Sequence, residues 1–294
     1  MGNKLAQPIR VSELARHLEL PCHGPDVVIT HVCPYDSANA GALCYSRAMI
    51  VEEDSVDAVV IAPMGSRQGA NAVIEATNSR LAFAKALIII DQTSGFVASV
   101  DPPVLGEGVF VSDTAVIGKG VVIGSRTFIG HHVVIADGVQ IGEDCIVKSN
   151  TVIGEPGFGF ERDEDGCPVR MLHLGGVIIG NRVEIGSLNT VCRGTLNDTI
   201  IEDDVKTDDH VHIAHNCRVR RGSLITACAE LSGGVDIGEF SWVGPNTSII
   251  QKAVLGSNVF VGIGSNITKS VPEGVAVAGN PARVLRGNQE TSEC

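Results

Sequence analysis

The sequence is short of positive charge. Lys and Arg together number 22 against 34 Asp and Glu, which gives the 294-residue chain a formal net charge of −12. Binding to nucleic acid depends on a basic field around the phosphates. The charge balance therefore argues against a nucleic-acid partner.

Long apolar runs are also missing. The N-terminal segment contains no apolar stretch of the kind found in secretory signals, and nowhere do ~18 apolar residues follow one another, as a membrane span requires. We therefore expect a cytoplasmic protein without a membrane span. The nine cysteines show no CxxC spacing. This pattern favours reduced thiols over disulfides or metal ligands.

A repeat of six residues dominates positions 111–271. An aliphatic residue recurs at every sixth position, and a small or β-branched residue follows four positions later. Such a period fits neither an α-helix nor a long alternating strand, but it is typical of short strands stacked as a parallel β-helix. Only Thr207 breaks the aliphatic rule. The first unbroken series is Val111, Ile117, Ile123, Ile129, Ile135, Ile141, Val147 and Ile153.

The repeat divides the chain into three parts. Residues 1–103 lack it and predict a small α/β domain, which ends at a pair of prolines, Pro102 and Pro103. Residues 104–271 form the predicted β-helix, and 272–294 a short C-terminal tail. Two insertions interrupt the β-helix, at 155–176 and at Arg193–Thr199. The glycines and phenylalanines of GFGF in the first insertion suggest a folded lip over a groove.

Several segments together resemble one enzyme family. They are VSELARHLEL and HGPDVVITHVCPYDSANAGAL near the N-terminus, then GFGF, RGTLNDT, VKTDDHVHIAHN and the glycine pair 233–234. These resemble the UDP-3-O-acylglucosamine N-acyltransferases of lipid A biosynthesis, part of lipopolysaccharide assembly. The resemblance implies a mainly β fold, with a left-handed parallel β-helix after a uridine-binding-like domain. It also implies a homotrimer that acylates the amine of a nucleotide-linked amino sugar.

The resemblance assigns the chemistry to three residues. His215 is the expected general base, because an imidazole titrates near neutrality, at ~6.5. Asp208 is its expected carboxylate partner, with Asp209 left open as the alternative. Gly233 follows His215 by eighteen residues, so a regular coil places it one layer above. Without a Cβ, its N–H can approach the oxyanion of an acyl-transfer intermediate.

The expected substrate contacts are more dispersed. Tyr45 is the candidate for stacking on the nucleotide base, although Ser46-Arg47-Ala48 follow it where the family has an Asn-Pro-Lys-Tyr type segment. Lys252 stands near the position of a second family histidine. The further substrate-binding candidates are Asn216, Phe158 and Phe160.

The acyl donor is left open. No permanently bound cofactor is expected, and the donor is the thioester of either acyl carrier protein or coenzyme A. The basic cluster Arg218, Arg220 and Arg221 suits coenzyme A phosphates or an acidic carrier face. The family's C-terminal helical extension is missing, and the GNPA ending is similar to coenzyme A-dependent sugar acetyltransferases. A coenzyme A-dependent N-acetyl- or short-acyltransferase is therefore the alternative.

Two lesser alternatives use the same fold differently. His210, His212 and His215 form an HxHxxH pattern, and γ-class carbonic anhydrases bind zinc with three histidines on a β-helix. Their ligands come from separated coils, so we expect no metal here. A non-catalytic trimer is the other alternative.

Overall fold

A computed structural model describes residues 3–49, 58–66 and 72–287. The chain divides into two compact units. Unit 1 comprises Met1–Ala98, Phe158–Gly175 and Thr195–Asn197, and unit 2 comprises Ser99–Gly157, Gly176–Gly194 and Asp198–Cys294. Within the described residues, no helix has the length and apolar character needed to cross a membrane.

Unit 1 is built on a six-stranded mixed sheet. Strands β3 to β6 run parallel, while β1 and β2 pair antiparallel at the two edges. Fully buried side chains from the sheet and both helices form its core, including Leu14, Ile61 and Phe83. In sheet order, the strands are β1 Lys4–Arg10, β3 Val28–Val32, β4 Ala42–Tyr45, β5 Val59–Pro63, β6 Ala72–Ala76 and β2 Cys22–His23.

Two α-helices, α1 (Val11–Leu18) and α2 (Ser79–Thr93), and the 3-10 helix η1 (Tyr35–Ser37) complete the N-terminal part. The Asn78 side chain caps α2 by accepting a hydrogen bond from the Leu81 N–H at 3.0 Å. Helix α1 has no side-chain cap, and the N–H of Ser12 in its first turn donates to the Asp26 carboxylate at 3.2 Å.

The first insertion packs on α2 of unit 1. It folds into an antiparallel hairpin of β16 (Phe160–Arg162) and β17 (Pro168–Arg170). Glu161 forms an ion pair with Arg80 of α2, and Met171 is buried in the unit 1 core. The sequence placed all of 155–176 with the β-helix, but these contacts group Phe158–Gly175 with unit 1.

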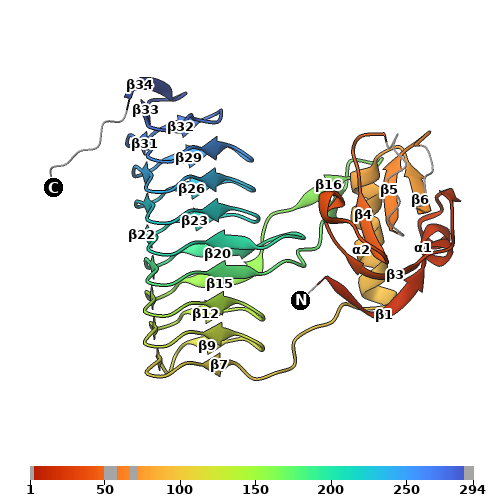
Figure 1. Cartoon of the computed structure of the whole chain (residues 1–294), viewed down its shortest axis with the longest axis horizontal. Coiled ribbons are helices and arrows are strands. Elements are labelled where there is room, and N and C mark those ends of the chain that lie inside the picture. The colour runs from red at the N-terminus through yellow and green to blue at the C-terminus, as the bar shows by residue number, and fades with distance from the viewer. Residues whose placement is uncertain (1–2, 50–57, 67–71, 288–294) are drawn as a thin grey trace. The chain divides into compact units, whose positions relative to one another are not determined.

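Unit 2 confirms the predicted parallel β-helix. Its strands form three faces, and successive strands of each face stack in the order of the sequence (Figure 1). In regular coils a residue pairs with the one eighteen positions later, as Ile123 does with Ile141. The first face consists of β7 Val104–Leu105, β10 Val122–Ile123, β13 Gln140–Ile141, β18 Val177–Ile179, β21 Thr199–Ile201, β24 Arg218–Val219, β27 Asp236–Ile237 and β30 Val254–Leu255.

The other two faces follow the same order. The second face consists of β8 Phe110–Val111, β11 Phe128–Ile129, β14 Ile146–Val147, β19 Glu184–Ile185, β22 Lys206–Thr207, β25 Leu224–Ile225, β28 Trp242–Val243, β31 Phe260–Val261, β33 Val275–Ala278 and β34 Arg283–Gly287. The third face consists of β9 Val116–Ile117, β12 Val134–Ile135, β15 Val152–Pro156, β20 Thr190–Arg193, β23 His212–Ile213, β26 Glu230–Leu231, β29 Ser248–Ile249 and β32 Asn266–Ile267. We call the turn after each face by its number, so the third corner follows each third-face strand.

The repeated aliphatic residues fill the interior, and Thr207 is buried among them. Its hydroxyl accepts hydrogen bonds from the Asn189 side-chain amide at 2.7 Å and from the Gly186 N–H at 3.2 Å. The Asn189 amide oxygen in turn accepts from the Val211 N–H at 2.7 Å. The exception to the aliphatic rule is therefore a satisfied polar pair inside the core.

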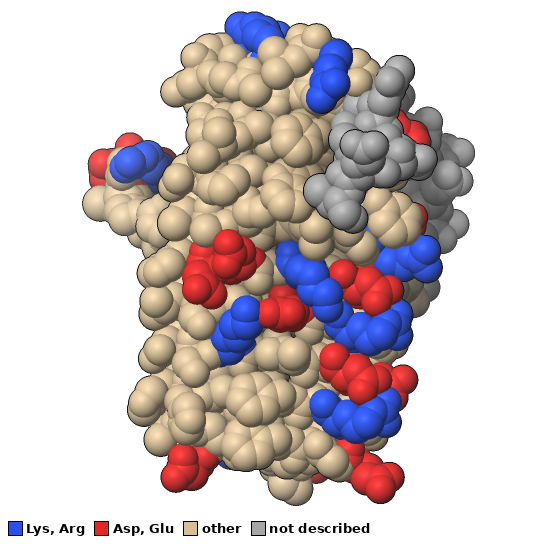
Figure 2. Space-filling view, turned by 90° about the vertical axis from the view of Figure 1, so that its left-hand side faces the viewer, with Lys and Arg blue, Asp and Glu red and all other residues tan. Residues whose placement is uncertain are grey.

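The outer surface combines ion pairs with exposed aromatic rings. At the first corner, Arg126 meets Asp144 and Arg182 meets Asp204, each on a neighbouring coil. Figure 2 shows basic and acidic side chains alternating along one edge of this view. On the second face, Phe110 stacks on Phe128 and Trp242 on Phe260, all at least 40% exposed.

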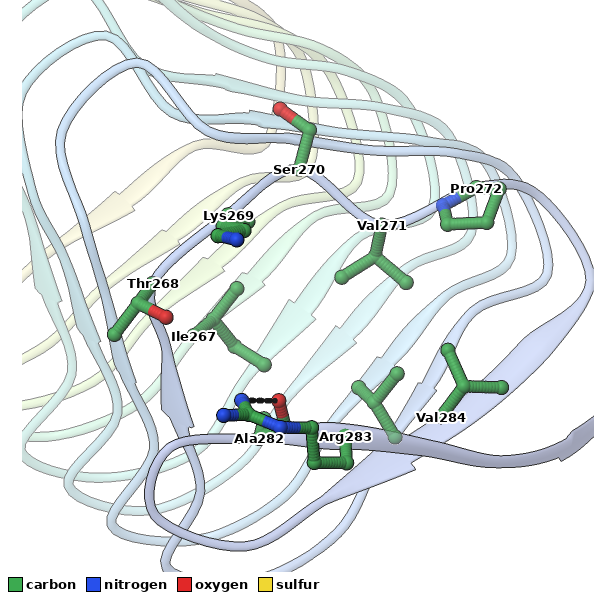
Figure 3. Close-up of a pocket in the computed structure, with 10 residues that line it drawn as sticks. Ile267, Thr268, Lys269, Ser270, Val271, Pro272, Ala282, Arg283 and Val284 are labelled. Carbon is green, nitrogen blue, oxygen red and sulfur yellow. Dashed lines mark hydrogen bonds between the residues drawn. The ribbon is translucent and has the colours of Figure 1, made fainter.

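Residues of the expected tail extend the second face. Strand β33 pairs parallel with β31 and antiparallel with β34. Between this hairpin and the last coil lies a cavity of about 340 Å³, whose lining includes Ile267, Val277, Lys269 and Arg283 (Figure 3). Residues 288–294 of the expected tail lie outside the described residues.

Candidate functional site

Both insertions leave the β-helix at the third corner. The first follows β15 and the second follows β20, and the next third-face strand, β23, leads to His215. The turn residues at this corner are His215 and Asn216 in one coil, Gly233 and Gly234 in the next, and then Gln251 and Lys252. The repeat spacing thus gathers most of the expected catalytic residues at a single corner of unit 2.

His215 lies directly against Gly233. A Cβ added to Gly233 would lie only 2.6 Å from Cε1 and 2.8 Å from Nε2 of the imidazole. The half-buried ring therefore packs on a backbone that only glycine leaves open. The backbone continues the stack, because the Gly234 N–H donates to the His215 carbonyl at 2.8 Å and the Lys252 N–H donates to the Gly233 carbonyl at 3.0 Å.

Asn216 fixes the orientation of the imidazole. Its side-chain oxygen lies 3.1 Å from Nδ1 of His215. With the amide oxygen facing the ring, this contact suits the tautomer in which Nδ1 donates and Nε2 is the basic nitrogen. Asn216 is itself held in the left-handed conformation, with φ of 60°, and its N–H donates to the buried Thr199 hydroxyl at 2.9 Å.

Asp208 lies at a different corner. It precedes β23, whereas His215 follows that strand, so the two residues stand at opposite ends of it. The Asp208 carboxylate is exposed and accepts from the Asp209 N–H at 2.9 Å, and Asp209 accepts from the Ser187 N–H at 2.7 Å. Within one chain, the Asn216 side-chain oxygen lies at Nδ1 of His215, and the orienting role of Asp208 or Asp209 stays a prediction.

His212 lies three residues before His215, and the sequence considered it only as part of the HxHxxH metal pattern. It lies on the third face between Thr190 and Glu230 of the adjacent coils. Its Nδ1 is 2.6 Å from the Thr190 hydroxyl. Burial lowers the pKa of His212 below its ordinary value, a shift opposed by the charge of Glu230 and assisted by His215. The eighteen-residue register from Glu230 is the sequence signal for this arrangement.

The arginine cluster is largely engaged in contacts between coils. Arg218 pairs with Glu202 at 2.6 Å, and Arg220 binds Asp236 through two hydrogen bonds of 2.7 and 2.9 Å. Arg221 lies over the Phe240 ring at the first corner, 5.3 Å from its centroid. These contacts stabilise the stacking of the coils, and a donor-binding role for the three arginines remains a prediction.

Cys217 follows Asn216 but faces the interior. Its side chain is fully buried, and desolvation raises the pKa of its thiol to about 12. A thiolate is the nucleophilic form of cysteine, so this position does not favour a covalent acyl-thiol intermediate.

The expected nucleotide contacts belong to unit 1. The Tyr45 ring, at the end of β4, packs on Phe83 with the ring centroids 4.9 Å apart. Phe158 is 89% exposed, and its ring meets Phe160 edge-on at a centroid distance of 4.9 Å. The Arg170 guanidinium lies over Phe160 at 4.6 Å. Roles for these aromatic residues in substrate binding remain predictions.

The histidines of the HxHxxH pattern separate in the fold. His210 lies at the second corner, His212 on the third face and His215 at the third corner. Among the residues that the structure describes, no three His, Cys, Asp or Glu side chains are grouped so as to hold a metal ion.

Comparison with known families supports the repeat. The family model "Bacterial transferase hexapeptide (six repeats)" matches residues 102–137 and 125–155. Residues 102–155 therefore carry the hexapeptide repeat that this model describes. A UDP-3-O-acylglucosamine N-acyltransferase from Herminiimonas arsenicoxydans is 33% identical to it over 117 residues, which is 40% of this chain and 33% of that protein. One from Saccharophagus degradans is 54% identical over 72 residues, 24% of this chain and 21% of that protein.

A plant relative and two solved structures extend the comparison. A probable mitochondrial UDP-3-O-acylglucosamine N-acyltransferase 2 from Arabidopsis thaliana is 36% identical over 44% of this chain and 42% of its own length. A crystal structure of a UDP-N-acetylglucosamine acyltransferase aligns with a TM-score of 0.59 at 22% identity, covering 65% of this chain and 72% of that one. The Francisella novicida enzyme of that name gives 0.54 at 24% identity, covering 64% and 69%. The two structures support the fold of this hexapeptide-repeat protein.

Proposed function

We propose that this hexapeptide-repeat protein is an N-acyltransferase. It moves an acyl group from a thioester to the amine of a nucleotide-linked amino sugar, as in the N-acylation step of lipid A assembly. The contact between the His215 imidazole and the Gly233 backbone carries the proposal, because it supplies a base and an oxyanion donor side by side. The names of the matched relatives support the substrate class.

The reaction follows from this geometry. Nε2 of His215 accepts a proton from the acceptor amine as the nitrogen attacks the thioester carbonyl carbon. The new N–C bond gives a tetrahedral oxyanion, which the Gly233 N–H stabilises. The C–S bond then breaks, and the imidazolium returns its proton to the departing sulfur, so the products are an amide and a thiol. Asn216 holds Nδ1 protonated throughout, which keeps Nε2 directed at the reacting groups.

A homotrimer located in the cytoplasm is part of the proposal. The exposed aromatic pairs of the second face, Phe110 with Phe128 and Trp242 with Phe260, provide an apolar surface suited to a second copy of the chain. A contact between Asp208 and His215 also needs a second copy, since one chain keeps them at different corners.

The alternative donor class is supported by the C-terminal end. The GNPA segment leads into β34, and Lys269 and Arg283 line the cavity beside it (Figure 3). Two cations that line one cavity are compatible with coenzyme A as well as with a carrier protein. Acetyl-coenzyme A and hydroxyacyl carrier protein are therefore compared as donors with a series of nucleotide amino sugars, and the products are identified by mass spectrometry.

The decisive experiment replaces the base. With the best donor and acceptor, His215→Ala should lower kcat by at least about 10²-fold, the range expected for loss of a general base. His210→Ala is the matched control, because His210 is an exposed histidine at the second corner. Both variants should keep the wild-type oligomer and circular dichroism spectrum. If His215→Ala retains most of its activity, or if no thioester donor is consumed by the wild type, the proposed function is wrong.

A further inference from the structure

Arg193 occupies the third corner one coil before His215. The register of the third face establishes this, because Val191 of β20 pairs with Ile213 of β23. Nη2 of Arg193 donates to the Asp137 carbonyl at 2.9 Å, which fixes one edge of the guanidinium. Its Nε atom is buried and has no hydrogen-bond partner in the described parts of the chain.

This arrangement differs from that of four other arginines on the coils. Arg126, Arg182, Arg218 and Arg220 each bind a carboxylate on a neighbouring coil. For Arg193 no ion pair occurs among the described residues. A half-buried guanidinium with an unsatisfied N–H is costly, and native proteins rarely keep one without a purpose. The guanidinium fork is suited to phosphate and other oxyanions, which it binds through paired N–H groups.

The order of residues at the corner gives the anion a place in the reaction. Gly233 lies on the C-terminal side of His215 and Arg193 on the N-terminal side. In the proposed reaction Gly233 takes the carbonyl oxygen of the donor, and an acceptor that extends toward the N-terminal side reaches Arg193. In a nucleotide-linked 2-amino sugar, the carbon that bears the amine adjoins the carbon that bears the phosphate. The amine and the phosphate are therefore only a few bonds apart, a separation comparable with the spacing of neighbouring coils, ~4.8 Å.

We propose that Arg193 binds the diphosphate of the acceptor and thereby places its amine at His215. This inference rests on the proposed function for the identity of the acceptor, while the anion site itself rests on the Arg193 geometry. Arg193 acts on substrate position and affinity, and His215 acts on proton transfer. Loss of each should therefore change a different kinetic constant.

The first test measures binding without turnover. Inorganic pyrophosphate and, separately, UDP are titrated into the full-length protein by calorimetry. Arg193→Gln should weaken pyrophosphate binding by about 10- to 100-fold, the effect of losing a charged hydrogen-bonding pair. Arg193→Lys, which keeps the charge but not the fork, should fall between Arg193→Gln and the wild type.

Arg182→Gln provides the matched control. It removes the same charge from the first corner, where Arg182 binds Asp203 and Asp204, and should change affinity by no more than about twofold because exposed pairs contribute little. Equal effects of the Arg193→Gln and Arg182→Gln variants would overturn the proposal. If Arg193→Gln proves unfolded by circular dichroism, Arg193→Lys decides, and unchanged pyrophosphate affinity in it also overturns the proposal.

The kinetic test separates this inference from the proposed function. With a nucleotide-linked acceptor, Arg193→Gln should raise KM while leaving kcat within a few-fold of the wild type, because binding rather than chemistry is lost. With the same amino sugar lacking phosphate, Arg193→Gln and the wild type should perform alike. A fall in kcat on both acceptors would show a merely structural role. Failure of His215→Ala to lose activity would refute the base assignment but leave the pyrophosphate result intact.

Discussion

Replacement of Gly233 by alanine tests the contact on which the proposed chemistry depends. The new methyl group would lie 2.6 Å from Cε1 and 2.8 Å from Nε2 of His215, where ordinary contacts begin at about 3.4 Å. The imidazole must therefore retreat by about 0.8 Å, while the backbone of residue 233 does not require a left-handed conformation. The perturbation is thus directed at the position of one ring.

The expected cost falls on catalysis more than on stability. A displacement of about 1 Å at a catalytic group can lower the rate by about 10²-fold, which corresponds to ~2.7 kcal/mol in the activation free energy. Overpacking a well-filled core costs about 1–3 kcal/mol. His215 is only half buried and can move toward solvent, so the free energy of unfolding should fall by less than that.

Gly234→Ala supplies the opposite pattern. Gly234 has φ of +73°, and its added Cβ would meet only Lys252, at 3.5 Å from Cγ and 4.0 Å from Cα. The left-handed backbone should cost about 1–2 kcal/mol of stability without moving the imidazole. The measurements are kcat from thiol release and the free energy of unfolding from urea denaturation, for both variants. Wild-type kcat in Gly233→Ala, or a larger loss of kcat in Gly234→Ala, would refute the reasoning.

Two further predictions concern neighbours of the imidazole. Asn216→Ala should lower kcat about five- to tenfold, the effect of one lost hydrogen bond. The control Asn246→Ala, at another corner residue with left-handed backbone, should leave kcat unchanged. Equal kcat values in the two variants would refute the orienting role of Asn216. His212 has a pKa below its ordinary value of 6.5 in the folded chain, so the unfolded chain binds the proton first as the pH falls. The contribution of neutral His212 to the free energy of unfolding is therefore present above about pH 6.5 and is lost as the pH falls below it. His212→Gln should therefore reduce the difference between the urea midpoints measured at pH 7.5 and pH 5.5, and an undiminished difference would contradict the buried, neutral state.

The sequence could predict the fold and much of the corner because both depend on one repeat. The spacing of eighteen residues brings His215 to Gly233, and the structure has them in contact. The same register would have revealed the acidic neighbours of Arg218 and Arg220, namely Glu202 and Asp236, which lie on adjacent coils. A close reading of the repeat therefore predicts which basic residues are already paired.

Other features depend on contacts that no repeat encodes. Asp208 is near His215 in sequence, but a strand of the third face separates the two corners. The first insertion joins unit 1 through Met171 and through the ion pair of Glu161 with Arg80, which are contacts between distant segments. The sequence RGTLNDT does not indicate a special role for Arg193, because the burial of its Nε can be seen only in the structure.

The buried pair of Thr207 and Asn189 helps to define the register in which the coils stack. Coils with similar aliphatic residues could pair in a register shifted by one coil, because each coil presents a similar apolar surface to the next. The Asn189 side-chain amide can donate to Thr207 only when the two residues lie on adjacent coils. A shifted register would leave both polar groups buried without this hydrogen bond, which is unfavourable. Together with other buried hydroxyls that bond between coils, such as those of Thr127 and Thr151, this pair therefore favours one register of the stack, and with it the level at which the imidazole meets its glycine.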